Sequence, residues 1–113
     1  MENKPHIVIV GGGASGILAA IMAARKGVPV TILEQKEQVG KKILSTGNGK
    51  CNFTNSKMEP SHFRGEDVSI VPKVLQKFDT NDTLKFFSEL GILPKERNGY
   101  YYPKSEQASA VQE

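Results

Sequence analysis

The residues best suited to chemistry in this sequence form a glycine-rich turn directly after an apolar run. The glycines follow the spacing Gly11-x-Gly13-x-x-Gly16. Gly11 permits a tight turn, Gly13 lets the backbone approach a pyrophosphate, and Gly16 lets a following helix pack closely. The amides of Ala14, Ser15 and Gly16 at the helix start then point toward an anion, which the helix dipole also favours. The turn is therefore predicted to hold the diphosphate of a dinucleotide.

An acidic residue at the end of the next apolar run completes the pattern. Glu34 lies 18 positions after Gly16, and its carboxylate can accept hydrogen bonds from both hydroxyls of an adenosine ribose. The same carboxylate repels a 2′-phosphate, which disfavours NADP as the ligand. Gln35 follows directly and is assigned to the same site. The alternative, a plain glycine turn in an unrelated α/β protein, is disfavoured by this context.

The phosphate-binding loop of nucleoside triphosphatases is another glycine-rich motif, and the sequence excludes it. That loop needs a lysine and then Ser or Thr directly after its last glycine. No lysine follows Gly16, and Cys51 follows the Gly49-Lys50 pair.

Three elements must hold the glycine turn in place. Residues 6–10 are apolar and rich in β-branched types, which predicts a strand buried on both faces, as in a parallel sheet. Residues 14–26 predict a helix that ends at Gly27, and residues 29–34 predict a second strand. Together they predict an α/β fold that starts with a Rossmann-like β-α-β unit.

The following part of the chain has a different character. Residues 36–70 are polar, rich in Gly, Asn, Ser and Lys, and weakly periodic, which predicts long loops with little regular structure. Residues 70–78 predict a short helix. Either Asp79 or Thr80 is expected to cap a second helix that runs through Leu90.

The last part of the chain predicts a hairpin and a final helix. Asn98-Gly99 lies between two strand-like runs, which is a strong signal for a two-residue hairpin turn. Ser105 is expected to cap a helix through the last eight residues, EQASAVQE.

Composition limits the classes of function. The chain has 113 residues, 38% hydrophobic and 24% charged, which fits one soluble globular domain. Its net charge of +3 is mild and its basic residues are scattered, so we expect no nucleic-acid partner. It has neither a run of 18 apolar residues nor a signal-peptide pattern, so we expect no membrane partner and a cytoplasmic location. No metal site is assigned.

The single cysteine has two interpretations. Cys51 is either a small buried residue in a packed loop or a redox-active thiolate near Lys50. The first is favoured because the chain has no resolving cysteine. No residue is a persuasive acid, base or nucleophile, so the catalytic residues stay unassigned.

Two longer motifs carry a resemblance to a known family. The glycine pattern, extended by Ala20 and Gly27 and closed by Glu34, resembles the FAD fingerprint of flavoproteins with two dinucleotide-binding domains. The run VGKKILSTGNGKCNFTN, residues 39–55, resembles the signature of the BaiN/YhiN-type flavoproteins, also called the aminoacetone oxidase family. The later GYYYPKSEQASAV is similar to another segment of that family, although Tyr100 stands where Arg is more usual.

The resemblance implies FAD binding and redox chemistry on a small organic substrate. Reduction of activated C=C bonds and amine oxidation are both attached to this family. The chain resembles the first quarter of such proteins, so we expect a fragment of a larger two-domain flavoprotein. Residues 1–113 would be a partial FAD-binding domain, made of the β-α-β unit at 1–35, a cofactor-contacting loop region at 36–69, and helices and a hairpin at 70–113. The C-terminal remainder would be absent.

Another class of function stays open beside this one, namely a non-catalytic, truncated module that binds FAD or NAD. NAD(P)H is a candidate electron donor for the oxidoreductase. The substrate and the oligomeric state are left open.

The polar loop offers further candidate contacts to FAD. Lys41 or Lys42 can supply a cation to the phosphates, and Asn52 and Thr54 can hydrogen-bond flavin edges or phosphates. Gly47 lies in a turn that lets the backbone come close to a ring system. The alternatives are solvated lysine side chains and a glycine that serves only the turn itself.

Overall fold

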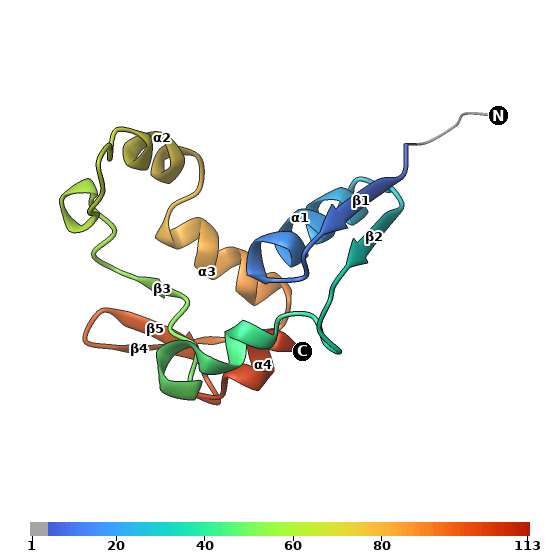
Figure 1. The fold of residues 1–113 in the computed structure, drawn as a ribbon. Helices are drawn as coiled ribbons and strands as arrows, with labels where there is room; N and C mark the ends of the chain where they lie inside the picture. The colour runs from blue at the N-terminus through green and yellow to red at the C-terminus, as the bar shows by residue number, and fades with distance from the viewer. Residues whose placement is uncertain (1–4) are drawn as a thin grey trace.

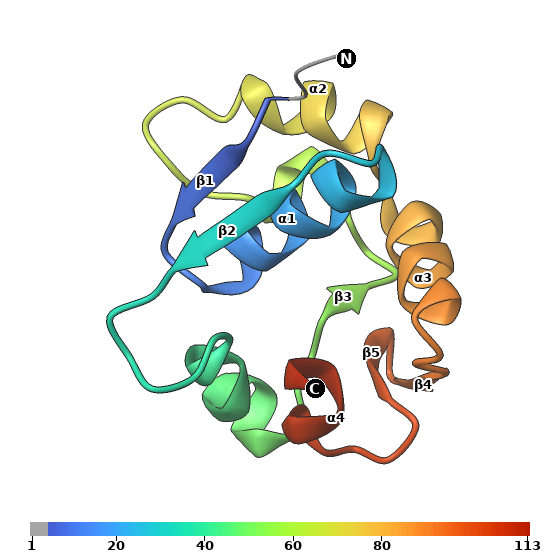
Figure 2. The same cartoon turned by 90° about the vertical axis from the view of Figure 1, so that its right-hand side faces the viewer.

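The glycine turn connects the first strand and helix of a β-α-β unit. The computed structural model describes residues 5–113. In it, β1 (Ile7–Val10) and β2 (Val30–Leu33) pair in parallel, residue for residue, and α1 (Ala14–Arg25) connects them and packs against both (Figures 1 and 2). Gly27 follows the helix with a φ of 74°, the left-handed conformation expected of a helix-terminating glycine. The predicted β-α-β unit is thus confirmed.

The burial predicted for the first strand is wrong for the described residues. Val8 is 55% exposed and Val10 is 84% exposed, and Leu33 of β2 is 53% exposed. The physical reason is that this sheet has two strands and a single helix, so residues 5–113 bring α1 to the sheet but no second layer. The apolar character of β1 therefore marks a surface that the described chain does not cover.

The polar segment after β2 has more regular structure than its composition predicts. It contains η1 (Lys41–Gly49), which is 3₁₀-helical but kinked at residues 46–48, the short 3₁₀ helix η2 (Pro60–His62), and the short strand β3 (Thr54–Asn55). The turns of η1 are closed partly by side chains, because Ser45 Oγ donates to the Lys42 carbonyl at 2.9 Å. Short 3₁₀ turns lack the 3.6-residue periodicity of an α-helix, so the sequence did not predict these elements. The residues between them are irregular, as expected of long loops.

The two predicted middle helices are confirmed. They are α2 (Ile70–Lys77) and α3 (Thr80–Glu89). Asp79 caps α3 in a capping box: its side chain accepts from the Asp82 amide, and the Asp82 side chain accepts from the Asp79 amide, both at 2.9 Å. Gly91, with a φ of 85°, follows the end of α3.

A second, antiparallel sheet follows. The hairpin strands β4 (Pro94–Arg97) and β5 (Tyr100–Pro103) pair as predicted, and β3 joins the other edge of β5 to give the order β3-β5-β4. Asn98 and Gly99 form the turn with φ values of 52° and 86°, as a two-residue turn with positive φ at both positions requires.

The last helix is shorter than predicted. It is α4 (Ala108–Gln112), and Gln107 rather than Ser105 is its N-cap residue. Glu106 interrupts the backbone in a left-handed conformation, with a φ of 55°, and its carboxylate forms ion pairs with Arg97 at 3.0 Å and Lys95 at 3.5 Å. These cross-links to β4 hold the chain out of the helical conformation until residue 108.

A group of buried residues lies where α4, η1 and the hairpin meet. Cys51, Ala108 and Pro103 are buried there, with Ala108 only 1% exposed. A stack between Phe53 and Phe87, with ring centroids 4.4 Å apart, joins the polar segment to α3. The small core therefore fastens the polar segment rather than the first sheet.

Candidate cofactor-binding site

In the glycine turn, the backbone of the start of α1 packs closely against the backbone at the end of β1. The Gly11 amide donates to the Leu33 carbonyl at 2.8 Å, and its φ of 102° favours glycine. A Cβ on Gly16 would overlap the Gly11 carbonyl oxygen, so Gly16 is needed for close packing of α1, as predicted. A Cβ on Gly13 would have no described atom within 4 Å, so the space in front of Gly13 is open.

The start of α1 is open to an anion. Gly13 is the N-cap residue, no side chain of the described residues caps the helix, and its first turn contains no acidic residue. Ala14 and Ser15, the first two helical residues, are exposed. Helix N-terminal amides without partners bind anions through hydrogen bonds and the helix dipole.

The carboxylate of Glu34 is tied to this turn. Its Oε1 accepts from the Gly12 amide and its Oε2 from the Lys36 amide, each at 2.8 Å. These bonds, the Lys36 bond most, lower the pKa of Glu34 below its ordinary value of 4.5, so the group is ionised at neutral pH. Each oxygen keeps acceptor capacity for another donor, such as a ribose hydroxyl.

A hollow of about 500 Å³ lies beside the turn and gathers five predicted residues. It lies between the glycine turn, the end of β2 and the start of η1. Glu34 supplies a negative charge, while Lys41 and Lys42 supply positive charges from η1. The lining residues are Gly12, Gly13, Glu34, Gln35, Lys36, Gln38, Lys41, Lys42 and Ser45.

Asn52 and Thr54 lie elsewhere. The side-chain amide of Asn52 donates to the Thr54 carbonyl of β3 at 2.9 Å and to the Tyr101 carbonyl of β5 at 3.0 Å, so it fastens the loop to both strands. Together with Ala14 and Ser15, Asn52 borders a second, largely apolar pocket of about 420 Å³ between α1 and α3. The Thr54 hydroxyl is buried and has no hydrogen-bond partner among the described residues. Neither residue lines the hollow beside the glycine turn.

Gly47 and Cys51 serve the fold of the loop. Gly47 has a φ of 54°, and a Cβ there would lie 2.5 Å from the Asn52 amide nitrogen, so the turn itself requires glycine. Cys51 is 5% exposed and free, as the interpretation of a small packed residue predicts.

The sequence analysis did not assign four residues that line the hollow, namely Gly12, Lys36, Gln38 and Ser45, nor Gly40 beside it. Gly12 and Gly40 are both buried, and the Gly40 amide donates to the Gly12 carbonyl at 2.6 Å. Gly40 is left-handed, with a φ of 68°. The available signal for Gly12 was that the middle residue of the Gly11–Gly13 run, which the dinucleotide pattern leaves free, is also glycine.

The described residues contain no group of three or more His, Cys, Asp or Glu side chains that could hold a metal ion. In the same range, 5–113, no helix is long and apolar enough to cross a membrane.

Comparison with known proteins identifies the family. Residues 5–113 match the HI0933-like protein Rossmann domain. The chain belongs to this family. The HI0933-like match covers both the glycine turn and the η1 segment, in agreement with the resemblance that the two sequence motifs carry.

Curated relatives of this HI0933-like chain are enzymes by name, among them a reductase and an oxidase. It is 55% identical over 110 residues to the 3-dehydro-bile acid delta(4,6)-reductase of Clostridium scindens, covering 96% of this chain and 27% of that protein. It is 33% identical to the ribosomal RNA dihydrouridine synthase of Haemophilus influenzae, and the match covers 86% of this chain and 24% of that protein. It is 31% identical to the L-amino-acid oxidase of Vipera ammodytes ammodytes, and the match covers 92% of this chain and 20% of that protein. The chain thus spans about a quarter of the length of these relatives.

Substitution by alanine should change the stability of the protein differently at Gly16, inside α1, and at Gly13, its N-cap residue. We expect Gly16→Ala to lower the free energy of unfolding by about 1–3 kcal/mol, because its Cβ overlaps a backbone oxygen. Gly13→Ala is the matched control and should leave stability almost unchanged, since its Cβ enters open space. Denaturant unfolding measures both, and equal losses would contradict the close packing at Gly16.

Glu34 should make the stability of the turn depend on pH. Its pKa is lowered in the folded state, so its contribution is present above 4.5 and is lost as the pH falls through the folded-state pKa. We expect the stability difference between wild type and Glu34→Gln to shrink as the pH falls from 7 to 3. A difference that stays constant over this range would show that the carboxylate charge does not matter to the turn.

Proposed function

We propose that this chain is the FAD-binding part of a flavin-dependent oxidoreductase. The observation that carries the proposal is the hollow beside the glycine turn. It combines an uncapped helix start, an ionised carboxylate at the end of β2, and two lysines on η1. These are the groups that a diphosphate flanked by an adenosine ribose requires.

Each group has a distinct part in holding the cofactor. The amides at the start of α1 bind the diphosphate in the open space at Gly13. Glu34 accepts hydrogen bonds from the ribose hydroxyls, and Gln35 lies beside it. Lys41 or Lys42 adds a cation for the phosphates. When bound, the flavin supplies hydride transfer, and these residues supply binding and orientation.

The same geometry is compatible with the alternative function, a module that binds FAD or NAD without catalysis. The ribose and diphosphate contacts are common to both dinucleotides, so the hollow alone does not separate them. The 55% identity to a reductase supports redox chemistry, and the η1 motif supports FAD over NAD.

Reduction of an activated C=C bond is the reaction class that we favour. The relative at 55% identity is named as a bile acid reductase and the one at 33% as a dihydrouridine synthase, whereas the Vipera ammodytes ammodytes oxidase is 31% identical. We infer that the full-length protein reduces a C=C bond conjugated to a carbonyl group in a small molecule.

The full-length protein should purify with the visible absorbance bands of a flavin cofactor. With NADH or NADPH as donor, we expect it to reduce a conjugated ketosteroid. An L-amino acid and a uridine-containing RNA are the comparison substrates. A colourless protein that also fails to bind added FAD would overturn the cofactor. A yellow protein that oxidises only the amino acid, or reduces only the RNA, would overturn the substrate class.

The lysines of η1 can be separated from ordinary surface lysines. We expect Lys41→Gln or Lys42→Gln to weaken FAD binding about fivefold to tenfold and to reduce its dependence on salt, because a cation near a phosphate is lost. Lys57→Gln is the control, since Lys57 lies outside the hollow. Titration of the apoprotein at several salt concentrations measures the effect. Equal behaviour of all three variants would make Lys41 and Lys42 solvated side chains.

A further inference from the structure

The segment between β2 and η1 sets the distance between the two walls of the hollow. The Gly40 amide donates to the Gly12 carbonyl at 2.6 Å. The Val39 side chain also covers Gly12, because a Cβ on Gly12 would lie 2.7 Å from Val39 Cγ1. Lys41 directly follows this contact. The position of the η1 lysines relative to the glycine turn therefore depends on how residues 38–40 are held.

The C-terminal helix holds the same segment from the other side. Gln112 Nε2 donates to the Val39 carbonyl at 3.1 Å and lies 3.5 Å from Gln38 Oε1. Its Cγ packs on Gly40, at 3.3 Å from the position that a Cβ would occupy. Helix α4 also packs along η1, as Figure 2 shows. A residue more than seventy positions away in the sequence thus fixes the entry to η1.

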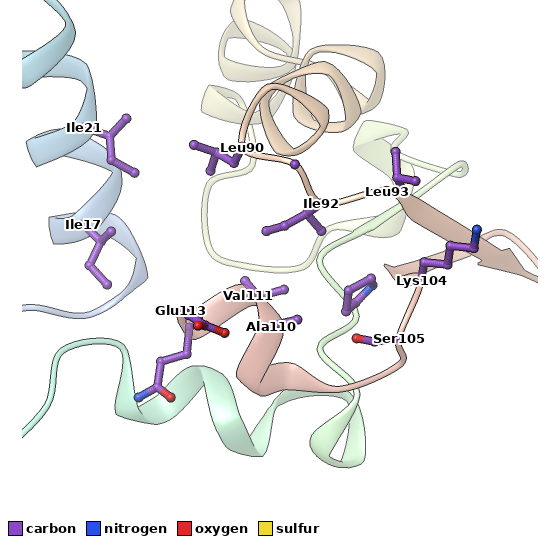
Figure 3. Close-up of a pocket in the computed structure, with 13 residues that line it drawn as sticks. Ile17, Ile21, Leu90, Ile92, Leu93, Lys104, Ser105, Ala110, Val111 and Glu113 are labelled. Carbon is purple, nitrogen blue, oxygen red and sulfur yellow. The ribbon is translucent and has the colours of Figure 1, made fainter.

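Another face of α4 borders a pocket. Ala110 and Val111 border a pocket of about 700 Å³ that Ile17 and Ile21 of α1 also line (Figure 3), so α4 is separated from α1 by open space there. Within residues 5–113, Gln112 is the residue of α4 whose side chain hydrogen-bonds another element.

We propose that Gln112 is a positioning residue for Lys41 and Lys42. It does not line the hollow and acts only through residues 38–40. Its amide proton and its packing on Gly40 keep the backbone of this segment against Gly12, and this places the lysines beside the phosphates. The proposal rests on the proposed function, because its effect is read through the binding of a diphosphate.

The test is a titration of the full-length apoprotein with two probes, FAD and ADP. ADP carries the adenosine and the diphosphate without the flavin. We expect Gln112→Leu to weaken both about fivefold, the effect of one neutral hydrogen bond, and to reduce the salt dependence of binding. Gln112→Glu keeps the shape but lacks the donor, so it should behave like Gln112→Leu. Gln107→Leu is the matched control, since Gln107 is exposed on the other end of α4.

A double-mutant cycle separates positioning from simple stabilisation. In a Lys41→Gln/Lys42→Gln background, Gln112→Leu should have little further effect on affinity, since the lysines that it positions are gone. Full additivity, or an unchanged affinity with a lowered unfolding temperature, would overturn the proposal. If the wild-type protein binds ADP and Gln112→Leu binds it with the same affinity, the inference about Gln112 is overturned while the proposed function stands. If wild type binds neither probe, the proposed function and the inference that rests on it are both overturned.

Discussion

The candidate site depends on the way in which the peptide groups of Gly12 are held. Its amide donates to Glu34 Oε1, and its carbonyl accepts from the Gly40 amide. Three stretches that are separated in the sequence, namely the turn, the end of β2 and the start of η1, thus meet at one buried residue. A side chain there would collide with Val39, so only glycine lets all three approach. The shape of the hollow follows from this junction.

The same junction resolves an electrostatic conflict. A carboxylate close to a diphosphate site would repel the ligand if its charge were unbalanced. Two backbone amides already bond to Glu34, and they lower its pKa while they disperse its charge. Lys41 and Lys42 of η1 line the same hollow, so positive charge is available there for the phosphates of the proposed cofactor. Glu34 therefore braces the glycine turn, and in the proposed function it also accepts the ribose hydroxyls.

The sequence predicted elements that local rules determine. The β-α-β unit, the Asp79 cap and the Asn98-Gly99 turn each follow from residues that are close together in the chain. Prediction from the sequence failed where contacts between residues far apart in the chain determine the local structure. The start of α4 depends on ion pairs of Glu106 with β4, and the role of Asn52 depends on Tyr101. Burial of β1 could not be predicted either, because burial depends on layers that no local pattern encodes.

The contact between Gly12 and Gly40 also constrains how this sequence can vary in length. The five residues from Gln35 to Val39 must span from the brace at Glu34 to the junction at Gly40. Adding or deleting one residue there would shift both lysines past the hollow. Residues 61–70 are all exposed, and loop length at the surface costs little. Natural insertions should therefore accumulate between η2 and α2 and be absent between β2 and η1.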